Sequence, residues 1–127
     1  MTVPSDPVSH VMRRSTVHVR PASTLREIAE TLVREEVGAA VVKGAEMAGI
    51  VSERDLVRAL ADGVDPDSDR AEDVMTFDVV SVRSDTTIES VARTMLDGGI
   101  RHLPIIDEDG PVGIVSIRDL FRAYLDQ

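Results

Sequence analysis

Three side chains of different chemistry recur at the same spacing in two places along the chain. They stand within two similar twelve-residue stretches, GIVSERDLVRAL at 49–60 and GIVSIRDLFRAY at 113–124. Free amides at a helix start, a serine hydroxyl and a guanidinium together bind phosphate, and a carboxylate can accept hydrogen bonds from two ribose hydroxyls. The pattern is therefore typical of a nucleotide site. Its members are Ser52, Arg54 and Asp55 in the first stretch, and Ser116, Arg118 and Asp119 in the second.

Helix capping explains part of the same pattern without any ligand. Each serine stands directly before an apolar run of helical period, which is the place of an N-cap, and the aspartate three residues later completes a capping box. The arginines are different. Arg54 and Arg118 fall at the second helical position, where a cation beside the positive end of the helix dipole costs about 0.3–1 kcal/mol. A bound anion would reverse that sign. The residues alone leave ligand binding and capping equally open.

The two stretches belong to a repeat that fills nearly the whole chain. Residues 11–12, Val-Met, match residues 74–75, and residues 16–42 match residues 79–105 at the same offset. A polar segment around Pro66, at 62–73, separates the two copies. We therefore expect two repeats, at residues 1–65 and 66–127.

Each repeat is predicted to have the order β-α-β-β-α. First strands are expected at 16–19 and 79–82, and two hairpins from strands at 39–43 with 47–51 and at 102–106 with 111–115. The second helices are expected to begin at Ser52 and Ser116. The first helices are expected to end at Gly38 and at the pair Gly98-Gly99. Those first helices are indicated by apolar residues at helical spacing, which are Leu25, Ile28, Ala29 and Leu32, and Ile88, Val91, Ala92 and Met95.

A repeat of about sixty residues is too small to bury both faces of a three-stranded sheet by itself. We therefore expect an α+β protein in which the two repeats pack sheet to sheet. The helices would lie outside, and approximate two-fold symmetry would leave a cleft at the junction. Met12 and Met75 occur in register before the two first strands and are interpreted as core residues.

The composition disfavours several classes of function. A net charge of −9 argues against nucleic-acid binding, which needs a basic surface, and against docking on anionic lipid. The chain has no cysteine, so disulfides and thiolate metal sites are excluded. No apolar run approaches the ~18 residues of a membrane span, and the N-terminus lacks the order of a signal peptide. A cytoplasmic protein that does not bind membranes is expected.

No other group of residues indicates an enzyme or a metal site. The three histidines have no metal-ligand spacing, and no nucleophile stands with a base. The acidic stretch at 65–70 places aspartates at the first, third and fifth positions of a calcium loop. However, Arg70 and Thr76 stand where glycine and glutamate are needed. We expect a chain without catalytic activity and without an obligatory cofactor.

The doubled β-α-β-β-α pattern, the GIVSxRDL stretches and the sequence RHLPIID at 101–107 resemble a pair of cystathionine β-synthase (CBS) domains, also called a Bateman module. The resemblance covers about residues 8–125. It implies binding of AMP, ADP, ATP or S-adenosylmethionine in the cleft between the repeats, and a homodimer formed through helical faces. The expected function is a ligand sensor that regulates a partner protein in trans. The alternative is a non-catalytic interaction scaffold with degenerate ligand sites.

The resemblance also implies roles for individual residues. The two aspartates would hold ribose hydroxyls, the two serines phosphate or ribose, and the two arginines phosphate, with Ile114 part of the second matching motif. The base would be lined by residues of the first strands and of the second hairpin, which are Thr16, Val17, Val79, Val80, His102, Leu103 and Pro104. The first repeat has GAAVV at 38–42 where the second has RHLPI. The Asp119 site is therefore expected to be favoured over the Asp55 site.

Overall fold

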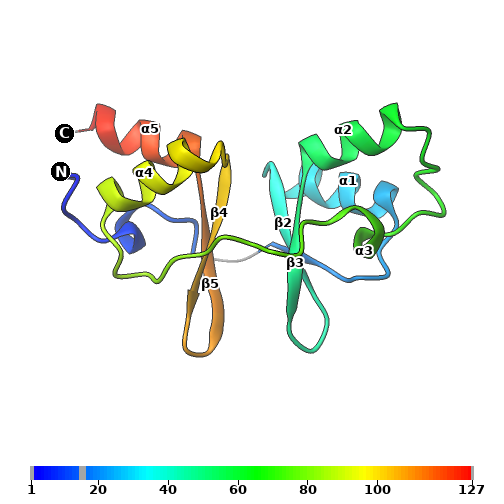
Figure 1. Cartoon of the computed structure of the whole chain (residues 1–127), viewed down its shortest axis with the longest axis horizontal. Helices are drawn as coiled ribbons and strands as arrows, with labels where there is room; N and C mark the ends of the chain where they lie inside the picture. Colours follow the sequence, from blue (N-terminus) through cyan, green and yellow to red (C-terminus); the bar gives the residue numbers. More distant parts are fainter. Residues whose placement is uncertain (1, 15–16, 127) are drawn as a thin grey trace. The chain divides into compact units, whose positions relative to one another are not determined.

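The computed structural model describes residues 2–14 and 17–126, which form two compact units. One unit is the continuous stretch Val17–Val79, and the other combines Met1–Thr16 with Val80–Gln127. Each contains a pair of helices beside an antiparallel hairpin (Figure 1). This mixture of helices and strands in two similar copies confirms the predicted α+β class. The division of the sequence into repeats at residue 65 stays a prediction, because the units follow packing rather than repeat boundaries.

The unit of residues 17–79 is built on a three-stranded sheet. Its strands are β1 (His18–Val19), β2 (Ala39–Lys43) and β3 (Met47–Ser52), and its helices are α1 (Leu25–Glu35), α2 (Glu53–Ala61) and α3 (Ala71–Val74). Strand β1 pairs in parallel with β2, and β2 pairs antiparallel with β3. The expected hairpin and both expected helices are therefore confirmed. The first three residues of the four-residue α3 belong to the segment that the sequence had suggested to be a polar linker, 62–73.

The second unit is built on a two-stranded sheet. It contains a short 3-10 helix at Val8–His10, then α4 (Ile88–Gly98), β4 (His102–Asp107), β5 (Gly110–Ser116) and α5 (Ile117–Leu125). Strands β4 and β5 pair antiparallel, with His102 opposite Ser116. The hairpin and the two long helices agree with the sequence prediction.

The predicted strand at 79–82 is wrong, and one proline explains why. In the first unit the amide of Val41 donates to the carbonyl oxygen of Val17 at 2.9 Å, which helps to hold β1 on β2. The repeat offset places Pro104 at the position of Val41, and proline has no amide hydrogen to donate. The second unit therefore keeps only an isolated parallel bridge between Val82 and Ile105 in this region.

Amphipathic spacing positions the long helices, and their ends differ. The buried residues of α1 and α4 belong to the predicted apolar sets. Gly99 ends α4 in the left-handed region (φ 62°), as predicted. The prediction that Gly38 ends α1 is wrong, because Glu36 takes the left-handed conformation two residues earlier (φ 55°). Val37 then packs against the core, the hydrophobic contact that often accompanies such a helix end.

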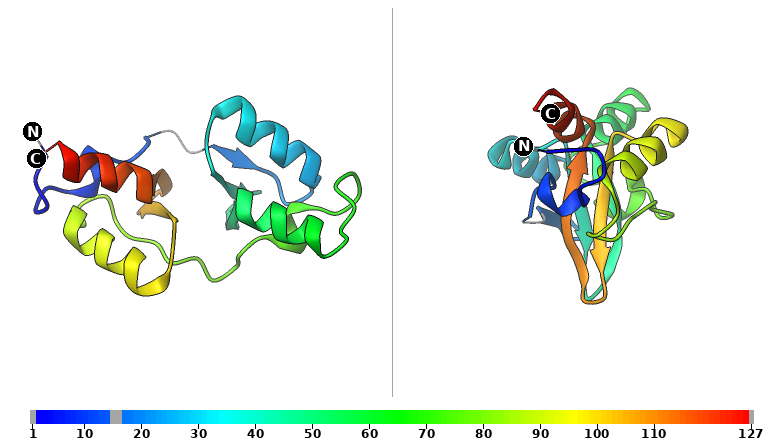
Figure 2. Two further views of the ribbon diagram at one scale, coloured as in Figure 1. Left: turned by 90° about the horizontal axis from the view of Figure 1, so that it is seen from above. Right: turned by 90° about the vertical axis from the view of Figure 1, so that its left-hand side faces the viewer.

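The segment that precedes the first strand of one repeat packs in the unit formed by the helices and hairpin of the other repeat. We call residues 2–14 the N-terminal arm, which lies with α4 and α5 (Figure 2). Val8 is fully buried there, and its amide donates to the carbonyl of Thr86 at 2.7 Å. The corresponding segment 71–77 packs in the unit of α1 and α2, where Ala71 is fully buried. Each unit is thus completed by the segment that precedes the other repeat.

Two glycines allow these segments to pass close to a strand. A Cβ on Gly49 would lie 2.3 Å from the carbonyl oxygen of Thr76, and a Cβ on Gly113 would lie 2.5 Å from that of Arg13. The sulfur atoms of Met75 and Met12 are the next neighbours of these two positions, at 3.1 and 2.9 Å. Both methionines pack against the cores of their units, as predicted. The first residue of each GIVS stretch is therefore fixed by chain packing.

Candidate functional site

The repeated serines and aspartates form the capping boxes that the sequence predicted. Ser52 caps α2: its amide donates to Asp55 Oδ2 at 2.8 Å, and the Asp55 amide donates to Ser52 Oγ at 3.2 Å. Ser116 caps α5 in the same way with Asp119, at 2.9 and 3.1 Å. All four side chains are part-buried. Capping therefore accounts for one oxygen of each carboxylate.

One amide at the start of each of these helices has no acceptor in the described part of the chain. The first amide of α2, from Glu53, donates to the carbonyl of Gly38 at 2.9 Å, and that of α5, from Ile117, donates to the carbonyl of Arg101 at 3.0 Å. The third amide donates to the capping serine. The second amide belongs to Arg54 in α2 and to Arg118 in α5, the two residues whose guanidinium groups were predicted to hold phosphate. A free amide and a guanidinium on the same residue can together bind an anion.

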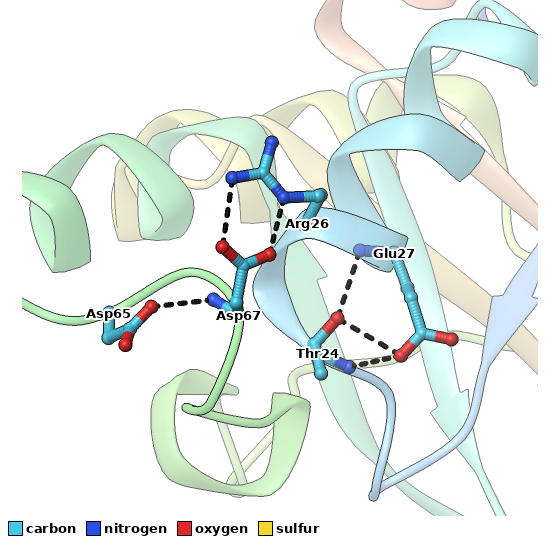
Figure 3. A network of polar contacts seen from close by, with 5 residues as sticks. All are labelled: Thr24, Arg26, Glu27, Asp65 and Asp67. Carbon is cyan, nitrogen blue, oxygen red and sulfur yellow. Dashed lines mark hydrogen bonds and ion pairs between the residues drawn. The ribbon is translucent and has the colours of Figure 1, made fainter.

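The start of α1 shows the same capping with no amide to spare. Thr24 and Glu27 form a capping box (Figure 3), and their hydrogen bonds lower the pKa of the Glu27 carboxyl. The first amide of α1 donates to the carbonyl of Asp69 at 3.1 Å, and the second, from Arg26, donates to the carbonyl of Pro66 at 2.9 Å. Segment 65–70 therefore closes this helix end, which leaves no amide for a ligand.

The start of α4 is closed by the N-terminal arm. The amide of Ile88 donates to the carbonyl of Asp6 at 2.9 Å, and that of Glu89 donates to the carbonyl of Pro4 at 3.0 Å. Thr87 caps the third amide, from Ser90, at 3.2 Å. As far as residues 2–14 and 17–126 show, α2 and α5 are the two long helices that keep an open amide at their start.

The arginine at the second position of α1 is paired with an acid, unlike the arginines at the same position of α2 and α5. Arg26 at the second position of α1 forms a two-bond ion pair with Asp67 (Figure 3), which raises the pKa of the guanidinium and lowers that of the carboxyl. Arg54 and Arg118 are exposed, and neither forms an ion pair within residues 2–14 and 17–126. The dipole penalty at α2 and α5 is thus not offset inside each unit.

The structure brings some of the residues expected around a base to the start of α5. His102 lies opposite Ser116 in the β4–β5 ladder, and Ile114 precedes Ser116 by two residues in β5 with 8% of its surface exposed. Leu103 and Pro104 are fully buried, and Leu103 packs among the core residues of its unit. The side chain of Leu103 is therefore held inside the core.

The expected first-strand residues do not all belong to the unit that contains α5. Val17 packs against the core of the first unit, and its carbonyl is bonded to the amide of Val41. Val79 is the last residue of that unit, and Val80 is the first residue of the stretch that completes the other unit. Thr16 lies outside the described residues.

Two positions at the helix entrances were not singled out by sequence reasoning. One precedes the first hairpin strand and supplies the carbonyl that accepts the first helical amide: it is Gly38 at α2 and Arg101 at α5. The other is the first helical residue itself, Glu53 or Ile117. The difference was visible in the aligned repeats as GAAVV against RHLPI and as SERD against SIRD. The sequence alone did not indicate that a residue fifteen or sixteen positions upstream meets the first residue of the helix.

Comparison with known proteins identifies the fold. The CBS domain family model matches residues 8–62 and 71–126. The chain belongs to the CBS domain family. A 17.7 kDa protein from Acidianus ambivalens is 42% identical over 122 residues, which cover 94% of this chain and 73% of that protein. The chain spans only 61% and 42% of the length of two further archaeal relatives, from Methanopyrus kandleri and Methanocaldococcus jannaschii.

Solved CBS structures have the same fold. A conserved protein from Pyrococcus horikoshii superposes with a TM-score of 0.90 at 24% identity, covering 96% of this chain and 94% of that one. The CBS domain pair of protein MJ0100, solved in complex with 5′-methylthioadenosine and S-adenosyl-L-methionine, superposes with a TM-score of 0.87 at 22% identity, covering 97% and 98% of the two chains. At these identities the likeness establishes the fold of the CBS pair.

The described residues contain neither a membrane-spanning helix nor a cluster of metal ligands. Within residues 2–14 and 17–126, no helix combines the length and apolarity that crossing a membrane requires. The same residues contain no group of three acidic or histidine side chains placed to hold a metal ion.

Proposed function

We propose that this CBS pair is a regulatory module that binds an adenosine-containing ligand, AMP, ADP, ATP or S-adenosylmethionine, and acts in trans on a partner protein without catalysing a reaction. The second repeat carries the preferred site. Asp119 accepts hydrogen bonds from the ribose, the Arg118 amide and guanidinium hold phosphate, and Ser116 and His102 border the ligand. Asp55, Arg54 and Ser52 form the corresponding weaker site.

The observation that carries this proposal is the unsatisfied start of α5. The Asp119 carboxylate uses Oδ2 for the capping bond to Ser116, and Oδ1 makes no hydrogen bond within the described residues. A carboxylate has about four acceptor positions, so capping and ribose binding can occur together. The adjacent open amide and unpaired guanidinium supply the anion-binding half. That MJ0100, a protein of the same fold, was solved with two adenosine derivatives supports the ligand class at the level of the fold.

A thermal shift series tests the proposal, with AMP, ADP, ATP and S-adenosylmethionine added separately. A ligand at one hundred times its dissociation constant should add about 2.7 kcal/mol to the free energy of unfolding. Asp119→Ala should lose this gain. The variant also loses the capping-box bond that Asp119 accepts from the Ser116 amide, so Thr24→Ala, which removes the capping hydroxyl of α1 at a cost of about 0.5–2 kcal/mol, is the control for lost capping. Thr24→Ala should lower the melting temperature of the free protein and keep the full ligand shift.

A scaffold with degenerate sites is the second candidate, and the capping boxes favour it. Thr24 and Glu27 have the same geometry as Ser52 and Asp55, although the start of α1 is closed to ligands. A chain that shows no shift with any of the four ligands, while Asp119→Ala and Thr24→Ala are equally destabilised, would be such a scaffold.

The partner in either case includes a second copy of the chain. Each of α2 and α5 buries only part of its apolar surface in its own unit. The exposed remainder is Val57 (65%) and Leu60 (55%) on α2, and Ile117 (45%), Phe121 (65%), Tyr124 (40%) and Leu125 (72%) on α5. The α5 residues share one helical face by their spacing. We infer that the chain forms a homodimer through these helical faces.

A further inference from the structure

The two helix entrances have the same backbone geometry but opposite charge. At α2 the four relevant positions hold Gly38, Glu53, Arg54 and Asp55, which together carry one excess negative charge. At α5 they hold Arg101, Ile117, Arg118 and Asp119, which together carry one excess positive charge. The difference comes entirely from the two positions that the sequence pattern does not share.

Hydrogen bonds place the four positions of each entrance next to one another. The Arg101 carbonyl accepts from the first amide of α5 at 3.0 Å, as the Gly38 carbonyl accepts from the first amide of α2 at 2.9 Å. The backbone of Arg101, a second exposed arginine, is therefore next to the entrance that already has Arg118. At the other entrance the same place has no side chain, and Glu53 adds an exposed carboxylate beside Arg54.

Resting on the proposed function, we propose that Arg101 and Glu53 determine which adenosine ligand each site accepts. The α5 site, with Arg101 and Arg118, takes a ligand that carries phosphate. The α2 site, where Glu53 directly precedes the residue with the open amide, binds phosphate more weakly and prefers an uncharged adenosine derivative. The two repeats are therefore sensors for different ligands.

The physical reason is the response of a charged ligand to nearby charge. Phosphate forms charge-assisted hydrogen bonds with guanidinium groups, which are roughly twice as strong as neutral ones. A carboxylate beside the same oxygens opposes binding by like-charge repulsion. An uncharged nucleoside responds to neither term, although it uses the same aspartate for its ribose. The ratio of affinities for AMP and adenosine thus separates the charge effect from every contact that the two ligands share.

Titration calorimetry with adenosine and with AMP tests the assignment. Asp55→Ala isolates the α5 site, and Asp119→Ala isolates the α2 site. In the Asp55→Ala chain, Arg101→Gln should weaken AMP binding about tenfold and change adenosine binding less than twofold. In the Asp119→Ala chain, Glu53→Ile, which installs the residue of the second repeat, should strengthen AMP binding about tenfold and leave adenosine unchanged. Arg93→Ala, which removes a positive charge from α4, should affect neither ligand.

Several outcomes would overturn the assignment. Equal loss of AMP and adenosine binding in Arg101→Gln would make Arg101 a structural residue. Equal AMP affinity at the two isolated sites would remove the distinction between the repeats. In both cases the proposed function would stand, since ligand binds. Absence of binding by AMP and adenosine to the wild-type chain would overturn this inference, whereas absence of a thermal shift with all four ligands of the earlier series would overturn the proposed function as well.

Discussion

Gly49 and Gly113 show that two residues shared by the repeated stretches serve the fold rather than a ligand. A methyl group at either position would fall within 2.3 or 2.5 Å of a carbonyl oxygen of the crossing segment. Backbone atoms can move away only if the segment itself shifts. The repetition of GIVS therefore has two origins, with packing at the glycine and helix capping at the serine.

We expect Gly49→Ala and Gly113→Ala each to lower the free energy of unfolding by about 1–3 kcal/mol, the range for overpacking a filled site. Urea denaturation measures the change. Gly44→Ala is the control, because a Cβ there would meet only Pro21 at an ordinary 3.8 Å. Stability equal to wild type in both test variants would show that the crossing segments are loosely held.

The carboxylate of Asp107 is predicted to make stability depend on acid. The amide and hydroxyl of Ser84 donate to its two oxygens at 3.0 and 2.6 Å, and these hydrogen bonds lower the pKa of Asp107. A pKa lower in the folded than in the unfolded state stabilises the fold above the unfolded value, about 3.9, and the benefit disappears as pH falls through the folded value. Wild type should therefore exceed Asp107→Asn in stability at pH 7, and the difference should close below about pH 4. Unfolding midpoints measured from pH 7 to pH 2.5 give the comparison, and a gap independent of pH would contradict this assignment.

At the scale of elements, hairpins and amphipathic helices were predicted well from the sequence, whereas helix ends and edge strands were predicted less well. Periodicity located α1, α2, α4 and α5 because their buried faces repeat with the helical period. The strand at 79–82 failed, because pairing depends on a donor in a distant residue, and Pro104 provides none. The end of α1 was misplaced because Glu36 adopts a conformation usually reserved for glycine. The capping boxes could be predicted because each serine and aspartate are three residues apart in the sequence. Arg101 was not singled out because it meets the start of α5 only through folding. The roles of these residues in ligand binding stay a prediction.

Helix α5 is predicted to carry the strongest anchors of the dimer. All three aromatic residues of the chain are exposed, at 66% for Phe77, 65% for Phe121 and 40% for Tyr124, and two of them are on α5. Aromatic residues are enriched at the energetic centres of interfaces. Phe121→Glu should therefore convert a dimer to a monomer in analytical ultracentrifugation while the melting curve keeps its cooperative shape. Val33→Glu, at an exposed position of α1, is the control and should leave the dimer intact, whereas a Phe121→Glu dimer would argue against this face.

At the scale of the whole molecule, the N-terminal arm is predicted to stabilise the unit of the second repeat. It buries Val8, closes the start of α4 and pairs with Ile114 through two backbone hydrogen bonds of 2.8 and 3.1 Å. Deletion of residues 2–14 should therefore reduce amide hydrogen-exchange protection in α4, β4 and β5, and leave protection in residues 17–79 near its original level. A synthetic peptide of residues 2–14 added to the shortened chain should restore part of the loss. Uniform loss across both units would contradict this division.

Because residues 2–14 and 71–77 each complete the unit of the other repeat, the chain cannot be divided simply at its repeat boundary. A cut at the expected boundary near residue 65 would yield two polypeptides, each lacking the piece that finishes its own fold and carrying the piece that finishes the other. Neither fragment would fold stably alone, yet the two fragments would complement each other on mixing. The two repeats thus have, on one polypeptide, the mutual dependence found in a domain-swapped dimer.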